Sequence, residues 1–327
     1  MLEISGLEVT FPGKDRRPVK VVRGVTLNVA RGETLGVVGE SGSGKSVTAL
    51  AALRLISSPG RIAAGKILLD GQDLLALPDS DMRAVRGGRI AMVFQDPLTS
   101  LNPTLTVGEQ LVETILAHRR MPRSEAWKEA IGWLERVRIP LASTRMRQYP
   151  TELSGGMRQR VVIAMAFCCR PEVLLADEPT TALDVTVQAQ ILDLMDDLKR
   201  ELNAAVVLIT HDLAVVAERC DRVAVMYAGQ VVETATATDI FERPQHPYTR
   251  ALLAAASDIL RPRSSEPLPG LAGQPPDPAR IPQGCPFAPR CPDVIDACRP
   301  APPPVVTVSP GHEARCIRTG SVSPDSE

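Results

Sequence analysis

The stretch Gly39-Glu-Ser-Gly-Ser-Gly-Lys-Ser46 is a glycine-rich loop between two regular elements. It follows the apolar run Thr34-Leu-Gly-Val-Val38, which predicts a buried strand, and it precedes a helical pattern over residues 47–55. Glycines let the backbone curl so that its N–H groups point at an anion, and the start of a helix adds positive potential. A strand, a glycine loop and a helix in this order predict a phosphate-binding site in an α/β fold.

The residues of this loop have distinct expected roles in binding ATP and Mg²⁺. The Lys45 side chain is long enough to reach the β- and γ-phosphates, and the Ser46 hydroxyl is a ligand for Mg²⁺. The residues expected to bind the nucleotide here are Gly39, Ser41, Gly42, Ser43, Gly44, Lys45, Ser46 and Val47.

Two acids follow a second apolar run. Val173-Leu-Leu-Ala-Asp177 predicts a strand that ends in a carboxylate, which places Asp177 at the carboxyl edge of a parallel sheet. There Asp177 would hold Mg²⁺ through the water shell of the ion. Glu178 comes next, and continued strand geometry would turn its side chain to the opposite face. We therefore expect one acid at the metal and the other at the attacking water.

The segment Leu153-Ser-Gly-Gly156 precedes a strong helical pattern over residues 157–167. A helix start with bare glycines and a serine hydroxyl is an anion site. Because the chain already has one phosphate site, a second one indicates a nucleotide held by another subunit. An ordinary capped helix would account for Ser154, but not for Leu153 and Gln159.

The order and spacing of these three segments resemble the ATPase subunit of ATP-binding-cassette (ABC) transporters, over roughly residues 1–240. The resemblance implies that Glu178 acts as general base or positions water, and that His211, after the apolar run 205–210, bonds the γ-phosphate. It also implies that Gln95, after the apolar run 89–94, contacts Mg²⁺ or water. The residues that it implies for contact with the partner subunit's ATP are Ser154, Gly155, Gly156 and Gln159.

Two further segments fit the same resemblance. Phe11 is similar in position to the aromatic residue on which the family stacks adenine, although packing in the core explains it equally well. Thr181-Ala-Leu-Asp184 resembles the loop that crosses the subunit interface, with threonine where serine is more usual.

The predicted fold class is α/β, with the core of a P-loop NTPase. Residues 1–243 would form the nucleotide-binding domain, with an antiparallel β part that begins with the alternating stretch 2–11. Amphipathic stretches at 107–120 and 124–137 predict an inserted helical subdomain over about residues 96–156. Residues 244–327 would form an irregular extension rich in proline and cysteine, since 15 of the 29 prolines lie between Pro262 and Pro310.

Composition limits the classes of protein that fit. The chain has 37 Lys plus Arg against 38 Asp plus Glu, a formal net charge of −1, so it lacks the basic stripe expected of an ATPase that tracks DNA. The N-terminus has no signal-peptide pattern. The longest apolar run, 161–169, is far shorter than the roughly 20 residues that span a bilayer. We expect a soluble chain that reaches the membrane through partners.

The extension contains four cysteines, Cys285, Cys291, Cys298 and Cys316. A cytosolic chain meets reducing conditions, which disfavour disulfides. Zinc would suit four cysteines, although the usual close pairs are missing, and so would an iron–sulfur cluster; spacing does not choose between the metals. The other three, Cys168, Cys169 and Cys220, lie in apolar contexts and are expected in the core.

The extension begins with Gln245-His-Pro-Tyr-Thr-Arg-Ala-Leu-Leu253, which resembles a segment of oligopeptide, dipeptide and nickel importer ATPases. This resemblance favours a [4Fe–4S] cluster. It implies an ATPase subunit for import of peptides or a related small solute, at the cytoplasmic face of the membrane. The implied partners are a second ABC ATPase subunit, commonly a paralogue, two membrane permease subunits and an extracytoplasmic solute-binding protein, with no nucleic acid.

Two other functions are compatible with parts of the sequence. A soluble ABC ATPase of DNA repair or translation would share the core, but those proteins typically carry coiled-coil or zinc insertions or two cassettes. A redox sensor with a vestigial ATPase would use the cysteines, but Lys45, Asp177, Glu178 and His211 are all in place. The transported solute is read by the partners, so the sequence does not choose among dipeptide, oligopeptide, nickel chelate and glutathione.

Overall fold

The computed structural model describes residues 1–14, 17–181, 183–258 and 273–319. The chain divides into two compact units, each assembled from separated stretches of sequence. We call them the helical unit, which comprises Met1 and residues 29–33 and 76–208, and the cradle unit, which comprises residues 2–28, 34–75 and 209–327.

An antiparallel sheet forms the N-terminal part of the cradle unit. Its strand order is β2-β1-β4-β5, and the bounds are β1 (Leu2–Pro12), β2 (Pro18–Val29), β4 (Arg61–Leu69) and β5 (Gln72–Asp73). In β1 the buried side chains include Leu2, Ile4, Leu7 and Val9, and the strand pairs antiparallel with β4. The antiparallel strand expected at 2–11 is therefore confirmed.

A second set of strands in the cradle unit carries the glycine-rich loop. The order is β11-β12-β10-β9-β3, with β3 (Thr34–Val38), β9 (Arg222–Tyr227), β10 (Gln230–Thr236), β11 (Val306–Ser309) and β12 (His312–Ala314). Strand β3 is buried along its whole length and runs parallel to β9, as the continuous apolar run predicts. The helices of this unit are α1 (Lys45–Ala52), α9 (Leu213–Arg219), α10 (Ala237–Glu242) and α11 (Pro247–Asp258).

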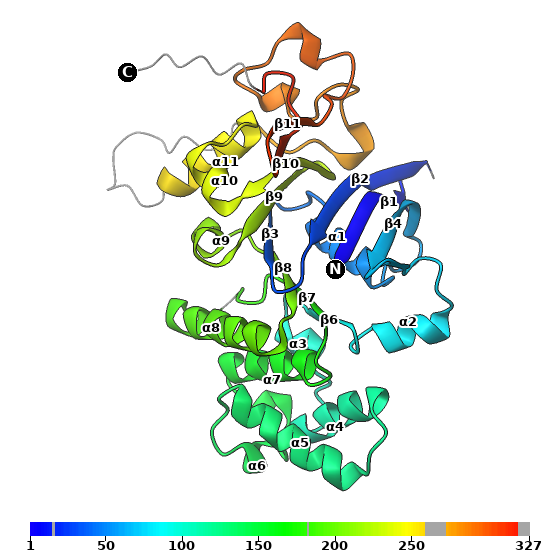
Figure 1. The fold of residues 1–327 in the computed structure, drawn as a ribbon, viewed down its shortest axis with the longest axis vertical. Coiled ribbons are helices and arrows are strands. Elements are labelled where there is room, and N and C mark those ends of the chain that lie inside the picture. Colours follow the sequence, from blue (N-terminus) through cyan, green and yellow to red (C-terminus); the bar gives the residue numbers. More distant parts are fainter. Residues whose placement is uncertain (15–16, 182, 259–272, 320–327) are drawn as a thin grey trace. The chain divides into compact units, whose positions relative to one another are not determined.

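The helical unit contains three neighbouring strands in the order β8-β7-β6, with β6 (Ile90–Val93) parallel to β7 (Val173–Asp177) and β8 spanning Ala205–Ile209. Helix α7 (Gly155–Phe167) is its central helix and contacts four other helices and β6 (Figure 1). Those four are α3 (Pro97–Ser100), α4 (Val107–His118), α5 (Arg123–Arg136) and α8 (Val185–Leu202). Two short helices complete it, α2 (Asp79–Val85) and α6 (Ala142–Arg145).

The start and end of α4 follow from its sequence. The Thr106 hydroxyl accepts from the Glu109 N–H, and the Glu109 carboxylate accepts from the Thr106 N–H at 2.8 Å, which is a capping box. The helix ends at His118 because Arg119 is extended, just ahead of Met121-Pro122. Helices at both predicted amphipathic stretches are thus confirmed. No helix in the described ranges is at once long and apolar enough to cross a bilayer.

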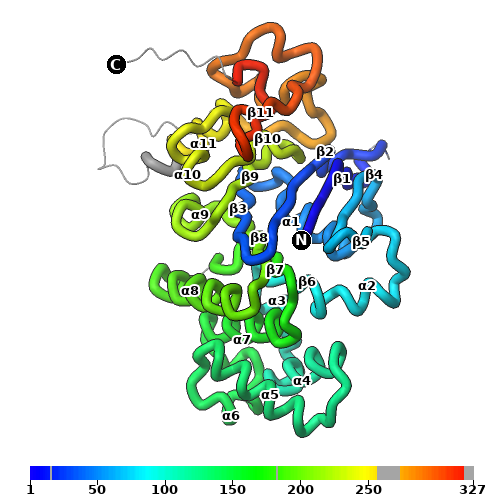
Figure 2. Tube along the Cα trace, in the orientation of Figure 1, coloured from blue at the N-terminus to red at the C-terminus, as the bar shows by residue number. Residues whose placement is uncertain are grey.

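The C-terminal extension is less irregular than the sequence predicts. Its short 3₁₀ turns at 278–280, 288–290 and 296–298 fit the dense prolines. However, β11 and β12 form a hairpin, and β11 lies close to β10 in Figure 2. The hairpin pairs with β10 through β12, with Glu233 opposite Ala314. The reason is the proline-free run Val305-Val-Thr-Val308, which is rich in β-branched residues. The part of the proline-rich stretch at 262–272 lies outside the described residues.

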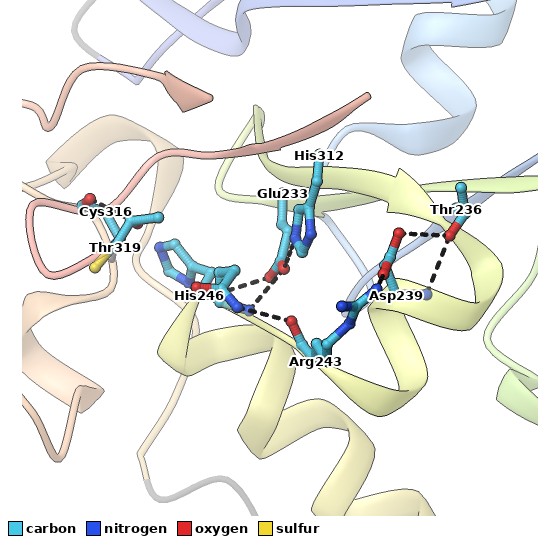
Figure 3. Close-up of polar contacts among 9 residues, drawn as sticks. Glu233, Thr236, Asp239, Arg243, His246, His312, Cys316 and Thr319 are labelled. Atoms are coloured by element: carbon cyan, nitrogen blue, oxygen red, sulfur yellow. Dashed lines mark hydrogen bonds and ion pairs between the residues drawn. The ribbon is translucent and has the colours of Figure 1, made fainter. Parts of the chain in front are cut away.

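A buried carboxylate ties the extension to β10. Glu233 accepts hydrogen bonds from the backbone N–H groups of Gln245 and His246, at 2.7 and 2.8 Å, and from His312 Nε2 at 2.9 Å (Figure 3). Nearby, the Thr236 hydroxyl caps α10 through the Asp239 N–H. The start of α11 and strand β12 are therefore joined to β10 through one buried side chain.

His246 is held in its neutral form. Its Nδ1 accepts from the Tyr248 N–H at 3.0 Å, and the ring also bonds the backbone of Arg315. Burial lowers the pKa of His246 to about 3, and the charge of Arg250 acts in the same direction. An exposed histidine protonates near pH 6.5, so between pH 6.5 and about 3 the unfolded chain binds a proton that the folded chain does not. Stability from this residue is therefore present above pH 6.5 and is lost as the pH falls below it.

We expect the free energy of unfolding, measured by urea denaturation, to fall between pH 7 and pH 5. In His246→Gln, which keeps a donor and an acceptor but does not titrate, the pH slope should be shallower by up to about 1.4 kcal/mol per pH unit. Equal slopes in the two proteins would contradict a neutral, buried His246.

Candidate functional site

The glycine-rich loop, residues 39–46, is held in a curl that its glycines permit; we call it the phosphate loop. Gly39 has φ +147°, and a Cβ there would lie 2.1 Å from the carbonyl oxygen of Met226. Gly42 and Gly44 also have positive φ, at +77° and +99°. The Ser43 N–H donates to the Glu40 carbonyl at 3.2 Å, which closes the curl. The expected cradle therefore forms between β3 and α1.

Polar groups inside the phosphate loop fit a phosphate ligand. Lys45 is buried, and its Nζ donates to the carbonyl oxygens of Gly39 and Glu40 at 2.8 and 3.0 Å. The Ser43 Oγ is buried and has no hydrogen-bond partner among the described residues, a costly arrangement that a ligand oxygen would relieve. Ser41 and Gly42 are exposed on the loop, and Ser46 and Val47 are half-buried at the start of α1.

Phe11 is half-buried at the end of β1. Its ring packs on Gly60, where a Cβ would lie 2.4 Å from a ring carbon. The packing role that the sequence left open is therefore present, and adenine stacking stays a proposal.

Acidic and amide side chains meet in the helical unit. Asp177 ends β7 and is buried. One oxygen of Glu178, Oε2, accepts from Gln95 Nε2 at 3.0 Å and from Thr181 Oγ1 at 2.9 Å. The structure thus brings together Gln95 and Glu178, which are far apart in sequence. In the same region Asp184 caps α8 through the Val187 N–H, while Ala182 lies outside the described residues.

Glu178 does not continue the strand. Its φ is +47°, a left-handed value that is uncommon for a residue with a side chain. The expectation that strand alternation sets the direction of Glu178 is therefore wrong, because the backbone turns out of β7 at this residue. Such backbone strain often occurs at functional sites.

His211 is exposed in the turn between β8 and α9, two residues after β8 ends. The next residue, Asp212, caps α9 by accepting from the N–H groups of Ala214 and Val215. The three residues expected at Mg²⁺ offer hydroxyl, carboxylate and amide oxygens, the donors that this ion prefers. Ser46 belongs to the cradle unit, while Gln95 and Asp177 belong to the helical unit.

The start of α7 has the features of an anion site. Ser154 is its N-cap and accepts from the Met157 N–H at 3.3 Å, while Gly155 is exposed. A Cβ on Gly156 would lie 2.9 Å from Val187, so α8 approaches closely here. Gln159 is only 1% exposed, so in this conformation its side chain is not offered to a nucleotide on another subunit.

The four cysteines of the extension gather in one part of the cradle unit. All are free thiols; Cys285, Cys298 and Cys316 are buried and Cys291 is half-buried. Burial raises the pKa of Cys285, and it raises the pKa of Cys291 to about 11. Neighbouring cysteines add to both shifts, Cys298 and Cys316 at Cys285, and Cys285 and Cys316 at Cys291.

These thiols do not form a metal site as they stand. Within the described residues, no group of three or more His, Cys, Asp or Glu side chains is placed to hold a metal ion. The geometry therefore does not support the expected [4Fe–4S] cluster or its zinc alternative. Elsewhere, Cys168 and Cys220 are buried as expected, and Cys169 is half-buried.

The sequence did not indicate the contacts by which Tyr248 and Arg290 hold Glu40 of the phosphate loop. Glu40, inside the loop, bonds Tyr248 and Arg290 of the C-terminal extension. The unusual segment around Tyr248 was a signal for such a contact, but nothing near Arg290 indicated one.

The fold and the site define a P-loop ATPase of the ABC class. Residues 22–181 match the family described as ABC transporter, and residues 232–298 match the family described as oligopeptide/dipeptide transporter, C-terminal region. The oligopeptide transport ATP-binding protein OppD of Salmonella typhimurium is 49% identical over 318 residues, which cover 97% of this chain and 93% of that protein. The dipeptide transport ATP-binding protein DppD of Bacillus subtilis is 47% identical, with 97% and 94% covered.

Among solved structures, a dimeric ATP-binding cassette in a post-hydrolysis state with bound ADP and phosphate matches with a TM-score of 0.64 and 28% identity. The match covers 72% of this chain and 99% of that one. The chain belongs to the ATP-binding subunits of the oligopeptide/dipeptide ABC transporter family.

Proposed function

We propose that this chain hydrolyses ATP to power the import of peptides through partner permeases at the cytoplasmic face of the membrane. Support comes from the peptide-transport names of relatives that match nearly the whole chain. The observation that carries the ATPase part is the phosphate loop, with its buried Lys45 and a buried Ser43 hydroxyl that no described residue bonds. A function in DNA repair or translation is not favoured, because the relatives reported above are named for peptide transport.

Binding of ATP would exchange one set of Lys45 contacts for another. The ammonium group that now bonds two loop carbonyls would turn to the phosphate oxygens, and the loop N–H groups and the α1 N-terminus would stabilise their charge. Bound Mg²⁺, with Ser46, Gln95 and Asp177 as its proposed protein contacts, would neutralise charge on the phosphates. His211 would bond the γ-phosphate, and Phe11 would stack on adenine.

Glu178 is the proposed general base. Its carboxylate is held by Gln95 and Thr181, which fix its orientation, and it directly follows the proposed metal acid Asp177. A carboxylate held in this way can orient a water molecule and accept its proton.

The exposed Ser154-Gly155 start of α7 supports a trans arrangement with a second ABC ATPase subunit. Each nucleotide would lie between one subunit's phosphate loop and the other subunit's Ser-Gly-Gly, so that ATP closes the pair and hydrolysis reopens it. We further propose two permease subunits and an extracytoplasmic solute-binding protein as partners. The proposed division is a nucleotide-binding domain at 1–243, with its helical subdomain at about 96–156, and an extension at 244–327.

A cluster at the four cysteines is a separate proposal that rests on their chemistry. Four thiols in one small region suit a [4Fe–4S] cluster, but ligand formation would require them to lose protons and move closer together. Anaerobically purified protein should then contain about four irons per chain, measured by metal analysis, and Cys291→Ser should lose them. Stoichiometric zinc, or no metal, would contradict the cluster.

The role of Glu178 predicts a specific defect. Glu178→Gln should keep ATP binding but lower the rate of hydrolysis by about two to four orders of magnitude, the range for loss of a general base. Phosphate release measures the rate. The exposed Glu125→Gln on α5 is a matched control and should hydrolyse ATP normally. Near-normal turnover in Glu178→Gln would show that Glu178 is not the general base.

A second pair of variants separates binding from assembly. Lys45→Ala should abolish most ATP binding by the isolated chain, measured by calorimetry, because it removes the charge that faces the phosphates. Ser154→Arg should leave that binding unchanged and stop hydrolysis in the assembled pair. Loss of ATP binding in isolated Ser154→Arg would show that the trans arrangement is wrong.

A further inference from the structure

Glu40 of the phosphate loop is held at both its side chain and its backbone by the C-terminal extension. Arg290 donates two hydrogen bonds to its carboxylate, Nη1 to Oε2 at 2.7 Å and Nη2 to Oε1 at 2.9 Å. The Glu40 backbone N–H donates to the Tyr248 hydroxyl at 2.9 Å. A residue inside the nucleotide site thus depends on two side chains more than 200 positions away.

Arg290 is a buried cation beside the Glu40 carboxylate. Its side chain is only 5% exposed, and its hydrogen bonds to Glu40 raise its pKa. Arg290 also donates to the Tyr227 hydroxyl at 3.3 Å. An arginine–carboxylate pair with two hydrogen bonds fixes geometry as well as charge. Breaking such a pair leaves an uncompensated charge behind.

Aromatic packing makes this anchor rigid. The rings of Tyr227, Tyr248 and Phe287 are in mutual contact, with centroids 4.5, 5.3 and 5.4 Å apart. All three side chains are fully buried. Tyr227 ends β9, Tyr248 lies on α11 and Phe287 precedes Arg290, so the cluster joins three segments at the loop.

The extension also borders the loop directly. Pro275, Pro276, Pro278 and Ile281 line a cavity together with residues 40–43 of the phosphate loop. The extension therefore lines the space beside the loop as well as bonding Glu40.

We propose that Arg290 and Tyr248 are positioning residues of the ATP site, which set the shape and the charge of the phosphate loop through Glu40. The Glu40 carbonyl accepts from both Lys45 Nζ and the Ser43 N–H, so a shift of Glu40 displaces the groups that receive phosphate. The Glu40 carboxylate would repel phosphate, and its pairing with Arg290 cancels that charge. The proposal rests on the proposed binding of ATP by residues 39–46.

A charge effect of Arg290 on ATP binding can be distinguished from simple structural damage by a second substitution at Glu40. In the full-length chain, Arg290→Ala should raise KM for ATP roughly tenfold, which corresponds to about 1.4 kcal/mol, with a smaller change in kcat. Adding Glu40→Gln to Arg290→Ala should recover most of the lost affinity, because the unpaired carboxylate is gone. No recovery in the double variant would overturn the proposal.

Two further variants sharpen the result. Tyr248→Phe keeps the ring packing and removes the acceptor of the Glu40 N–H, so KM should rise several-fold even if Arg290→Ala does not fold; an unchanged KM would overturn the role of Tyr248. Arg250→Ala is the matched control, since Arg250 pairs with Asp293 at 2.6 Å in the same extension. An equal rise of KM in Arg250→Ala would show general loosening and overturn the proposal.

Lys45→Ala separates failure of the inference from failure of the function. If Lys45→Ala binds ATP as the unchanged chain does, the proposed nucleotide site itself is wrong. If Lys45→Ala loses ATP while Arg290→Ala keeps the original KM, ATP binding stands and only the positioning role of Arg290 fails.

Discussion

The close approach of the phosphate loop to β9 is the constraint on which the nucleotide site depends. At Gly39 the backbone passes so near the Met226 carbonyl that any side chain would overlap it. The chain leaves the parallel strand β3 there and must turn at once, which closes the loop on itself and brings Lys45 back over its carbonyls. One backbone contact between neighbouring strands thus determines where phosphate can bind.

The parts of the fold that depend on local sequence could be predicted well. Strands β3 and β7 have the predicted bounds, because a strand covered on both faces is a continuous apolar run. Helices α4 and α5 begin and end within two residues of expectation, since capping and proline mark their limits.

The parts that depend on distant contacts could not be predicted. Glu40 and Arg290 are 250 positions apart, and no local pattern links them. The left-handed backbone at Glu178 reflects the turn after β7, whereas strand alternation assumed that the strand continues. The number of cysteines indicated a metal, but the positions of the four thiols relative to one another are set by tertiary packing, and in the described residues no three such side chains are placed to hold a metal ion.

The Glu233 network bears on how short a stable chain can be. The ATPase motifs end before residue 243, yet Glu233 has a fully buried carboxylate whose partners come from Gln245, His246 and His312. A chain cut after residue 243 would lose these donors and would also leave β10 without its partner strand β12, so an unpaired strand edge would replace a paired one. The smallest autonomous folding unit is therefore longer than the catalytic motifs require.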